Sequence, residues 1–183
     1  MPNAFDLDAA LIRILDLAIE ATDADFGTIQ VCGADGSLRI AGQRGFQPDF
    51  LEFFRIVKHD KSACSVVLQD RRRVVVRDVR RSPHFTEAAR RVMLDAGVVA
   101  SQSTPILSPA RDISGVVSTH FRTPHVPEAG ELDVVDVLAM EAGLIIKASQ
   151  ASLRRAEMTR VLSELKDSVA YKTRVIRGNR AKQ

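Results

Sequence analysis

The sequence contains no tryptophan and a single tyrosine, so aliphatic side chains and eight phenylalanines must fill its core. It has no run of about 18 apolar residues, which excludes a membrane-spanning helix. Residues 1–8 lack a basic segment followed by an apolar stretch, and we therefore expect no secretory signal. Cys32 and Cys64 are too few for a disulfide framework and have no Cys or His neighbour at zinc-finger spacing. A cytoplasmic protein with no metal site is the simplest expectation.

The composition is that of an ordinary globular chain. Its 183 residues suit one compact domain with an extension, and 45% hydrophobic with 27% charged residues allows a core of normal size. The formal net charge is +3, and part of the excess follows Leu165, at Lys166, Lys172, Arg174, Arg177, Arg180 and Lys182. Such a tail can contact nucleic acid or an acidic partner. No recognition motif or aromatic platform accompanies it, so we interpret the tail as a solvated helix end.

The beginning of the chain predicts a helix followed by a β-hairpin. Asp6 or Asp8 can cap a helix that runs to about Thr22. Its helical spacing comes from Leu7, Leu11, Ile14, Leu15 and Ala18. Residues 26–32 and 37–43 are predicted as two strands, joined by a turn at Ala34-Asp35-Gly36.

The middle of the chain predicts short helices alternating with strands. Four phenylalanines at helical spacing (46, 50, 53 and 54) favour a helix over 47–57, and Ser62 can cap a short helix over 63–69. The remaining predicted elements are a β-rich run over 73–79, a helix over 86–96 ended by Gly97, and two strands over 98–107 and 113–123.

A long helix is predicted after Pro127, which fits a first helical turn and is followed by acidic residues that suit the helix dipole. Apolar residues keep a helical rhythm for about 40 residues or more. They are Leu132, Val135, Leu138, Ala139, Ala142, Ile145, Ile146, Leu153, Ala156, Leu162, Leu165 and Val169. From about Ser152 the helix projects beyond a domain of this size, so its apolar stripe needs a partner. We therefore divide the chain into a domain over 1–150 and a coiled-coil-like extension with a basic tail over 151–183.

This order of elements predicts an α+β fold with a mainly antiparallel sheet. Together with five local phrases it resembles a GAF domain of the kind found beside bacterial PAS and histidine-kinase modules. The phrases are Ala24-Asp25-Phe26-Gly27, Gln43-Arg44-Gly45-Phe46, Ser62-Ala63-Cys64, Gln102-Ser103-Thr104-Pro105 and Ser118-Thr119-His120-Phe121. The resemblance covers roughly residues 6 to 150. It implies a PAS-related central antiparallel sheet, with helices on one face and a roofed small-molecule pocket on the other.

The resemblance does not name a ligand, because GAF domains differ in whether they hold cyclic nucleotides, haem, bilins, small anions or nothing identified. Bilin-carrying members attach the chromophore through a cysteine usually next to a histidine. Here Ser65 follows Cys64 and Gly33 follows Cys32, and no cyclic-nucleotide signature is present. The cofactor therefore stays unknown.

Strand alternation predicts which residues face the pocket. Ile29, Val31 and Val117 should face the helices, whereas Gln30, Ser118 and His120 should face the roof. Their amide, hydroxyl and imidazole groups suit a small polar ligand. The polar run Gln102-Ser103-Thr104 must also pair its inward side chains with one another, water or a ligand. With a cysteine on the short helix, the predicted ligand-binding set is Gln30, Cys64, Gln102, Ser118 and His120.

Two of these residues have a structural alternative. His120 can bind a ligand anion, an iron or a proton, or it can be a core histidine satisfied by a neighbouring Ser or carbonyl. Cys64 would lie in the first turn of its helix, where amide dipoles lower a thiol pKa, or it can simply fill space. The phenylalanine cluster can likewise wall a pocket or be plain core.

The sequence shows no Ser-His-Asp order, no glycine-rich phosphate loop and no paired metal ligands, so we expect no catalytic residues. We interpret the chain as a sensor domain that forms a parallel homodimer through its N-terminal helix and the helix after Pro127. It would bind a small effector over its sheet and signal through its long helix, with a histidine kinase or regulator as partner. A ligand-free dimerisation module is the alternative. An enzyme that resembles stand-alone GAF-fold reductases of free methionine sulfoxide is a further one, with Cys64 as its nucleophile.

Overall fold

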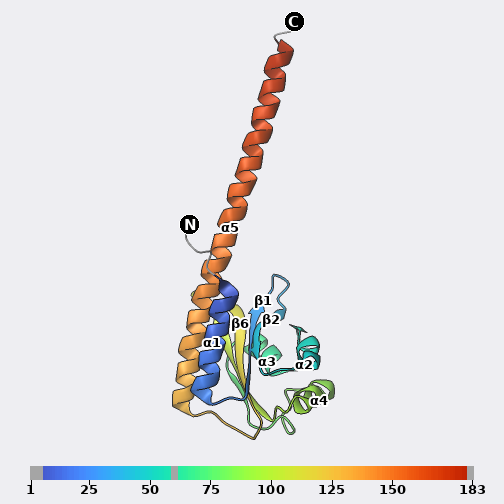
Figure 1. The fold of residues 1–183 in the computed structure, drawn as a ribbon, viewed down its shortest axis with the longest axis vertical. Helices are drawn as coiled ribbons and strands as arrows, with labels where there is room; N and C mark the ends of the chain where they lie inside the picture. Colours follow the sequence, from blue (N-terminus) through green and yellow to red (C-terminus); the bar gives the residue numbers. More distant parts are fainter. Residues whose placement is uncertain (1–5, 59–61, 181–183) are drawn as a thin grey trace. The chain divides into compact units, whose positions relative to one another are not determined.

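A computed structural model describes residues 6–58 and 62–180 (Figure 1). The chain divides into two compact units, a globular unit over Met1–Lys147 and a C-terminal unit over Ala148–Gln183. The helices are α1 (Leu7–Thr22), α2 (Pro48–Phe53), α3 (Ala63–Asp70), α4 (Glu87–Asp95) and α5 (Ala129–Arg180). No helix of the described ranges is both long and apolar enough to cross a membrane.

The centre of the globular unit is a six-stranded antiparallel sheet with the strand order β3-β2-β1-β6-β5-β4. Its strands are β1 (Phe26–Cys32), β2 (Leu38–Arg44), β3 (Ile56–Val57), β4 (Val74–Val76), β5 (Ala100–Leu107) and β6 (Ile113–Phe121). β1 and β6 lie in the middle of the sheet, so their side chains are covered on both faces. The predicted α+β fold with an antiparallel sheet is confirmed.

Helices cover both faces of the sheet and create two separate cores (Figure 1). On the first face, α1 and the beginning of α5 pack against Ile29, Ile106 and Val117. On the second face, the short helices α2, α3 and α4 form a roof over Phe26, Val116 and other buried residues of the sheet. We call these the helix face and the roof face. Ile29 and Val117 lie on the helix face, as their alternation predicts.

Local side chains fix where the helices begin. The Asp6 carboxylate accepts a hydrogen bond from the Ala9 amide and caps α1. Ser62 caps α3 and forms a reciprocal capping box with Ser65, which satisfies two amides that the helix itself leaves unpaired. Cys64 therefore lies in the first turn of α3, as predicted.

Two predicted boundaries are wrong. The helix predicted over 47–57 stops at Phe53, and Ile56 and Val57 instead pair with β2 as an edge strand. The phenylalanine spacing holds only for one face, since Phe50 is buried and Phe53 is 41% exposed. Pro127 precedes the long helix rather than lying in its first turn. The carbonyl of Glu128 accepts the first helical hydrogen bond, from Leu132.

The long helix α5 has two apolar stripes where one was predicted. Val135, Ala139, Ala142 and Ile146 are buried on the helix face. Gly143 approaches so closely that a β-carbon there would lie 2.0 Å from the Leu107 carbonyl oxygen. The second stripe, which contains Val137 and Leu144, is exposed.

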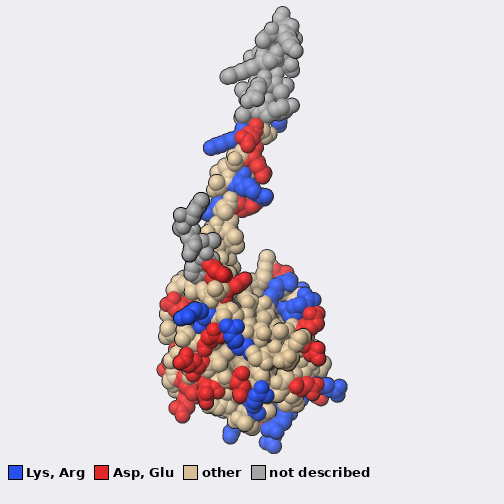
Figure 2. Space-filling model, in the orientation of Figure 1, with Lys and Arg blue, Asp and Glu red and all other residues tan. Residues whose placement is uncertain are grey.

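Charged side chains of both signs are interspersed over the face of the globular unit drawn in Figure 2. That face offers no continuous basic surface of the kind that nucleic-acid binding requires.

Candidate functional site

The roof face carries a polar patch at the centre of the sheet. It is formed by alternate residues of three neighbouring strands, namely Thr28, Gln30, Ser101, Ser103, Ser118 and His120, all of which are buried. Register places Ser103 opposite Ser118, and Ser101 opposite His120, across β5 and β6. Because side chains alternate along each strand, these partners point to the same face.

A cavity of about 30 Å³ lies between this patch and the roof. Its walls are Thr28 and Gln30 from β1, Ile40 from β2, Phe50 and Phe54 near α2, Ser62, Ala63 and Cys64 at the start of α3, and Phe85 and Met93. This volume is close to that of one water molecule, so a larger occupant requires the roof helices to move outward.

Several polar atoms at the patch have no hydrogen-bond partner among the described residues. They are Gln30 Oε1, Ser101 Oγ and both ring nitrogens of His120. Burying an unpaired polar atom is costly, typically by about 1–3 kcal/mol, and folded proteins rarely leave several together. The patch therefore has unused capacity to bind a water molecule or a polar ligand.

His120 lies against aromatic rings of the roof. Its ring centroid is 5.1 Å from that of Phe46 and 6.2 Å from that of Phe50, both in edge-to-face geometry. Burial lowers the pKa of His120 from 6.5 to about 3, because the charged form loses its hydration. The ring is therefore neutral near pH 7 and offers one donor and one acceptor.

Cys64 joins α3 to the polar patch. Its Sγ lies 3.6 Å from Ser118 Oγ and 3.9 Å from Ser103 Oγ, and the two hydroxyl groups are 2.8 Å apart. The thiol thus belongs to a small hydroxyl cluster at the base of the roof. Cys32 lies apart, at the β1–β2 hairpin. Burial, with a smaller contribution from Asp35, raises the pKa of its thiol and makes the reactive thiolate rarer.

The structure brings Gln30, Cys64, Ser118 and His120 together on the roof face but separates Gln102 from them. Gln102 pairs with Thr119, and its Nε2 donates to Thr119 Oγ1 at 3.2 Å on the helix face. The predicted placement of Gln102 beside the pocket is wrong, because alternate residues of β5 point to opposite faces. Of the partners left open for this polar run, the structure shows one internal pair, in which the Thr104 hydroxyl donates to Gln102 Oε1 at 2.8 Å.

Thr28 and Ser101 are further members of the patch that the predicted ligand-binding set does not include. Thr28 has the same strand parity as Gln30, and Ser101 has the same parity as Ser103. The alternation of side chains along each strand therefore indicates from the sequence that Thr28 and Ser101 share the faces of these two residues. The strand register that puts Ser101 beside His120 was not available, because it depends on the length and geometry of the β5–β6 turn.

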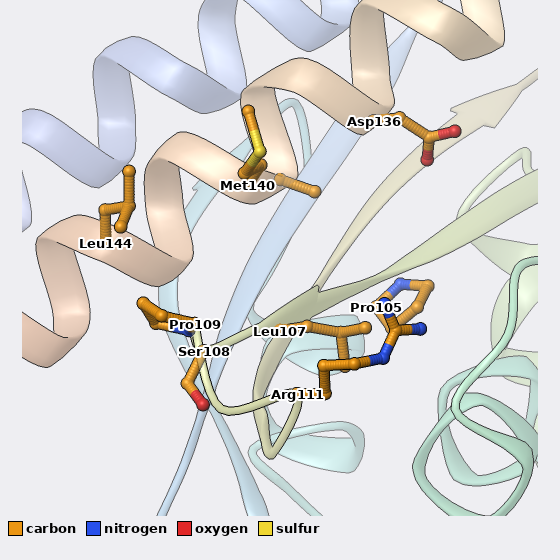
Figure 3. A pocket seen from close by; sticks show the side chains of 9 residues that line it. Pro105, Leu107, Ser108, Pro109, Arg111, Asp136, Met140 and Leu144 are labelled. Atoms are coloured by element: carbon orange, nitrogen blue, oxygen red, sulfur yellow. The ribbon is translucent and has the colours of Figure 1, made fainter.

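A second, larger cavity of about 590 Å³ lies on the helix face, between α5 and the β5–β6 turn (Figure 3). Its walls are mainly apolar and include Leu107, Pro109, Met140 and Leu144, with Arg111 and Asp136 at its margin. It shares no lining residue with the smaller cavity at the polar patch. Its apolar character makes it a surface for packing rather than for polar chemistry.

Comparison with known proteins identifies the family. The protein-family model described as GAF domain matches residues 6–146. No curated protein sequence matches the chain. Among solved structures, a domain of a two-component sensor histidine kinase from Sinorhizobium meliloti is 18% identical, with a TM-score of 0.69 over 84% of this chain and 99% of that one.

Two further structures show how varied the neighbours of this fold are. A GAF domain/HD domain protein from Geobacter sulfurreducens is 17% identical, with a TM-score of 0.68 over 80% of this chain and 95% of that one. A type II free methionine-R-sulfoxide reductase from Thermoplasma acidophilum is 12% identical, with a TM-score of 0.62 over 77% and 95%. Identities this low show a shared fold only. With its family match and its sheet topology, this chain belongs to the GAF domain family.

Proposed function

We propose that this GAF domain is a sensor that binds a small, uncharged polar effector between the polar patch and the roof. The observation that carries the proposal is the group of buried, unpaired atoms on Gln30, Ser101 and His120. The residues that line the cavity include no Asp, Glu, Lys or Arg, which favours a neutral ligand over an anion. The phenylalanines of the roof add an apolar wall, as ligand sites commonly have.

The effector would act by moving the roof. The cavity is small, so an effector larger than water needs its walls to move apart, and we propose that a shift of α2 or α3 selects this more open state. A ligand can shift this equilibrium only by its differential affinity for the two states. We propose that α5 carries the change onward to a signalling partner in the bacterial cytoplasm, such as a histidine kinase, which the neighbour from Sinorhizobium meliloti supports.

We also propose that the signalling form is a parallel homodimer held by α5. The exposed stripe of α5 follows a heptad pattern, with one position at Val137, Leu144, Ala151, Met158 and Leu165 and the other at Val134, Glu141, Ala148, Arg155 and Leu162. We call this pattern the α5 seam. Its large apolar members in both units are exposed, and Leu144 also lines the larger cavity. A second copy would cover both features.

The test of the sensor proposal is native mass spectrometry of the purified chain, followed by thermal shift against a panel of neutral heterocycles, amides and alcohols. We expect a compound that raises the melting temperature of the wild type but not of Gln30→Met. The matched control is Gln69→Met, which lies at an exposed position of α3 and should respond like the wild type. A panel to which both variants respond equally would contradict the site.

A dimer that retains no small molecule and responds to no compound would favour the alternative, a ligand-free dimerisation module. We propose no catalytic activity. The support is the setting of the two cysteines, because the Cys64 thiol lies beside the Ser103 and Ser118 hydroxyl groups and burial disfavours ionisation of Cys32.

A further inference from the structure

We propose that Arg73 is a positioning residue that couples the roof helix α3 to the output helix α5. The signalling role of this coupling rests on the proposed sensor function. The physical coupling between α3 and α5 can be measured without any ligand. No contact between the two helices themselves is needed, because Arg73 reaches α5 from the segment that follows α3.

Arg73 contacts both the sheet and the long helix α5. Its Nε donates to Thr104 Oγ1 at 2.9 Å, and its Nη2 donates to the Leu132 carbonyl oxygen at 2.9 Å. The same nitrogen forms an ion pair with the Asp136 carboxylate. The guanidinium therefore joins β5 to the first turns of α5 by several directed bonds. A lysine cannot reproduce this arrangement, because it lacks the planar fork.

From Thr104 the hydrogen bonds continue into the middle of the sheet. Thr104 donates to Gln102, and Gln102 donates to Thr119 in β6. This row lies on the helix face, directly behind the roof-face pair Ser103 and Ser118, because the residues alternate in sequence. The two polar rows therefore lie on opposite faces of the same two strands, β5 and β6.

On the roof face the corresponding row ends at α3. Cys64 contacts both Ser103 and Ser118, so a movement of α3 would displace side chains of β5 and β6. α3 also acts more directly, since it ends at Asp70 and Arg73 follows after only two intervening residues. Arg71 caps α3 in the left-handed conformation with φ of 52°, which fixes the direction of the chain into β4.

β4 is held to the chain segment that leads into α5 at both of its ends. Beyond its last residue, the Arg77 carbonyl accepts a hydrogen bond from the His125 amide, and before its first residue Arg73 bonds to Leu132 and Asp136. Any shift of β4 that follows α3 is therefore passed to residues 125–136. Arg73 is the link whose charge and geometry can be removed without touching either core.

The experiment uses amide NMR spectra of the full chain. Cys64→Ala perturbs the start of α3 without a ligand, and we expect it to shift the amide resonances of residues 132–136 in the wild-type background. In the Arg73→Gln background the same substitution should leave these resonances in place. Arg72→Gln is the matched control, because Arg72 is exposed and bonds only to Asp70 among the described residues.

Hydrogen exchange gives a second readout. Losing the charged hydrogen bonds of Arg73 should speed exchange at residues 132–136 roughly tenfold, and Arg73→Lys should restore it only in part. Should Arg73→Gln fold poorly, Asp136→Asn removes the ion pair from an exposed position and should weaken the coupling in the same direction. Shifts at 132–136 that persist in Arg73→Gln, or that never occur in the wild-type background, would overturn the coupling. The search for an effector is a separate experiment, so its failure leaves this result intact.

Discussion

Ser101 and His120 are register partners across β5 and β6, and neither side chain has a hydrogen-bond partner among the described residues. Two adjacent buried polar groups without partners are unusual in a folded protein. Burying these unpaired groups lowers the stability of the folded protein at this part of the roof face, and ligand sites are often found at such positions.

The first prediction concerns acid stability. The folded pKa of His120 is about 3, below its ordinary 6.5, so between these values the unfolded state binds the proton and the folded state does not. The free energy of unfolding should therefore fall as pH is lowered through this window, by up to about 1.4 kcal/mol per pH unit. Urea unfolding between pH 7 and 5, where few carboxylates titrate, measures it. In His120→Leu the free energy of unfolding should depend much less on pH over the same range. Equal slopes in the variant and the wild type would contradict the lowered pKa of His120.

A second prediction is that Gln30→Met stabilises the protein. The substitution removes the buried Oε1 that has no partner and keeps a side chain of similar length. We expect the free energy of unfolding to rise by about 1 kcal/mol in denaturant titrations, together with loss of effector binding. Gln69→Met at the surface of α3 should change stability little. A destabilised Gln30→Met would mean that the amide is satisfied by bound water.

The third prediction tests the α5 seam. Leu162→Glu places a charge within the seam and should convert the proposed dimer to a monomer in analytical ultracentrifugation. Leu153→Glu is the matched control, because Leu153 is also an exposed leucine of α5 but lies outside the heptad pattern. Monomers in both variants, or dimers in both, would exclude this seam.

A fourth prediction follows from Arg155, which occupies a seam position. In a parallel dimer the two Arg155 side chains would share one layer, where their charges repel. Arg155→Leu should therefore tighten dimerisation by roughly tenfold or more, and the gain should shrink at high salt, which already screens the repulsion. Sedimentation equilibrium at two salt concentrations tests this. A weaker dimer would contradict the parallel arrangement.

The fifth prediction uses two glycines of α5. A β-carbon at Gly143 would meet the Leu107 carbonyl oxygen at 2.0 Å, so Gly143→Ala should destabilise the globular unit by about 1–3 kcal/mol. Gly130 has no atom within 4 Å of the equivalent position. Gly130→Ala should be neutral or stabilising by up to about 1 kcal/mol, since alanine favours helix. Thermal unfolding of both variants tests the packing of α5 against β5.

Much of the fold could be predicted because its signals are local. The hairpin turn at residues 34–36, the cap at Ser62 and the periodicity of α1 each act over a few residues. Strand parity likewise separated Ile29 from Gln30. The end of α2 could not be predicted, because the pairing of Ile56 and Val57 with β2 is a tertiary contact that overrides helical spacing.

The site was predicted only in part, for the same reason. Gln102 and Ser103 are equally polar, and nothing local tells which of them faces the roof. That choice depends on the register between β5 and β6. The contacts of Arg73 with α5 depend on where that helix begins and could not be predicted from the sequence.

The polar run of β5 has a consequence for how the chain folds. Residues 101–104 are polar on both faces, so within this run a slip of one residue would only exchange one buried polar row for the other. The correct pairing must therefore be selected by the ends of the strand, through the turn at 108–112 with Arg111 at φ of 65° and the bulge beside Ile106. We expect this strand pair to lock its register only when the turn has closed, so changes at the turn should slow refolding more than changes at the polar run.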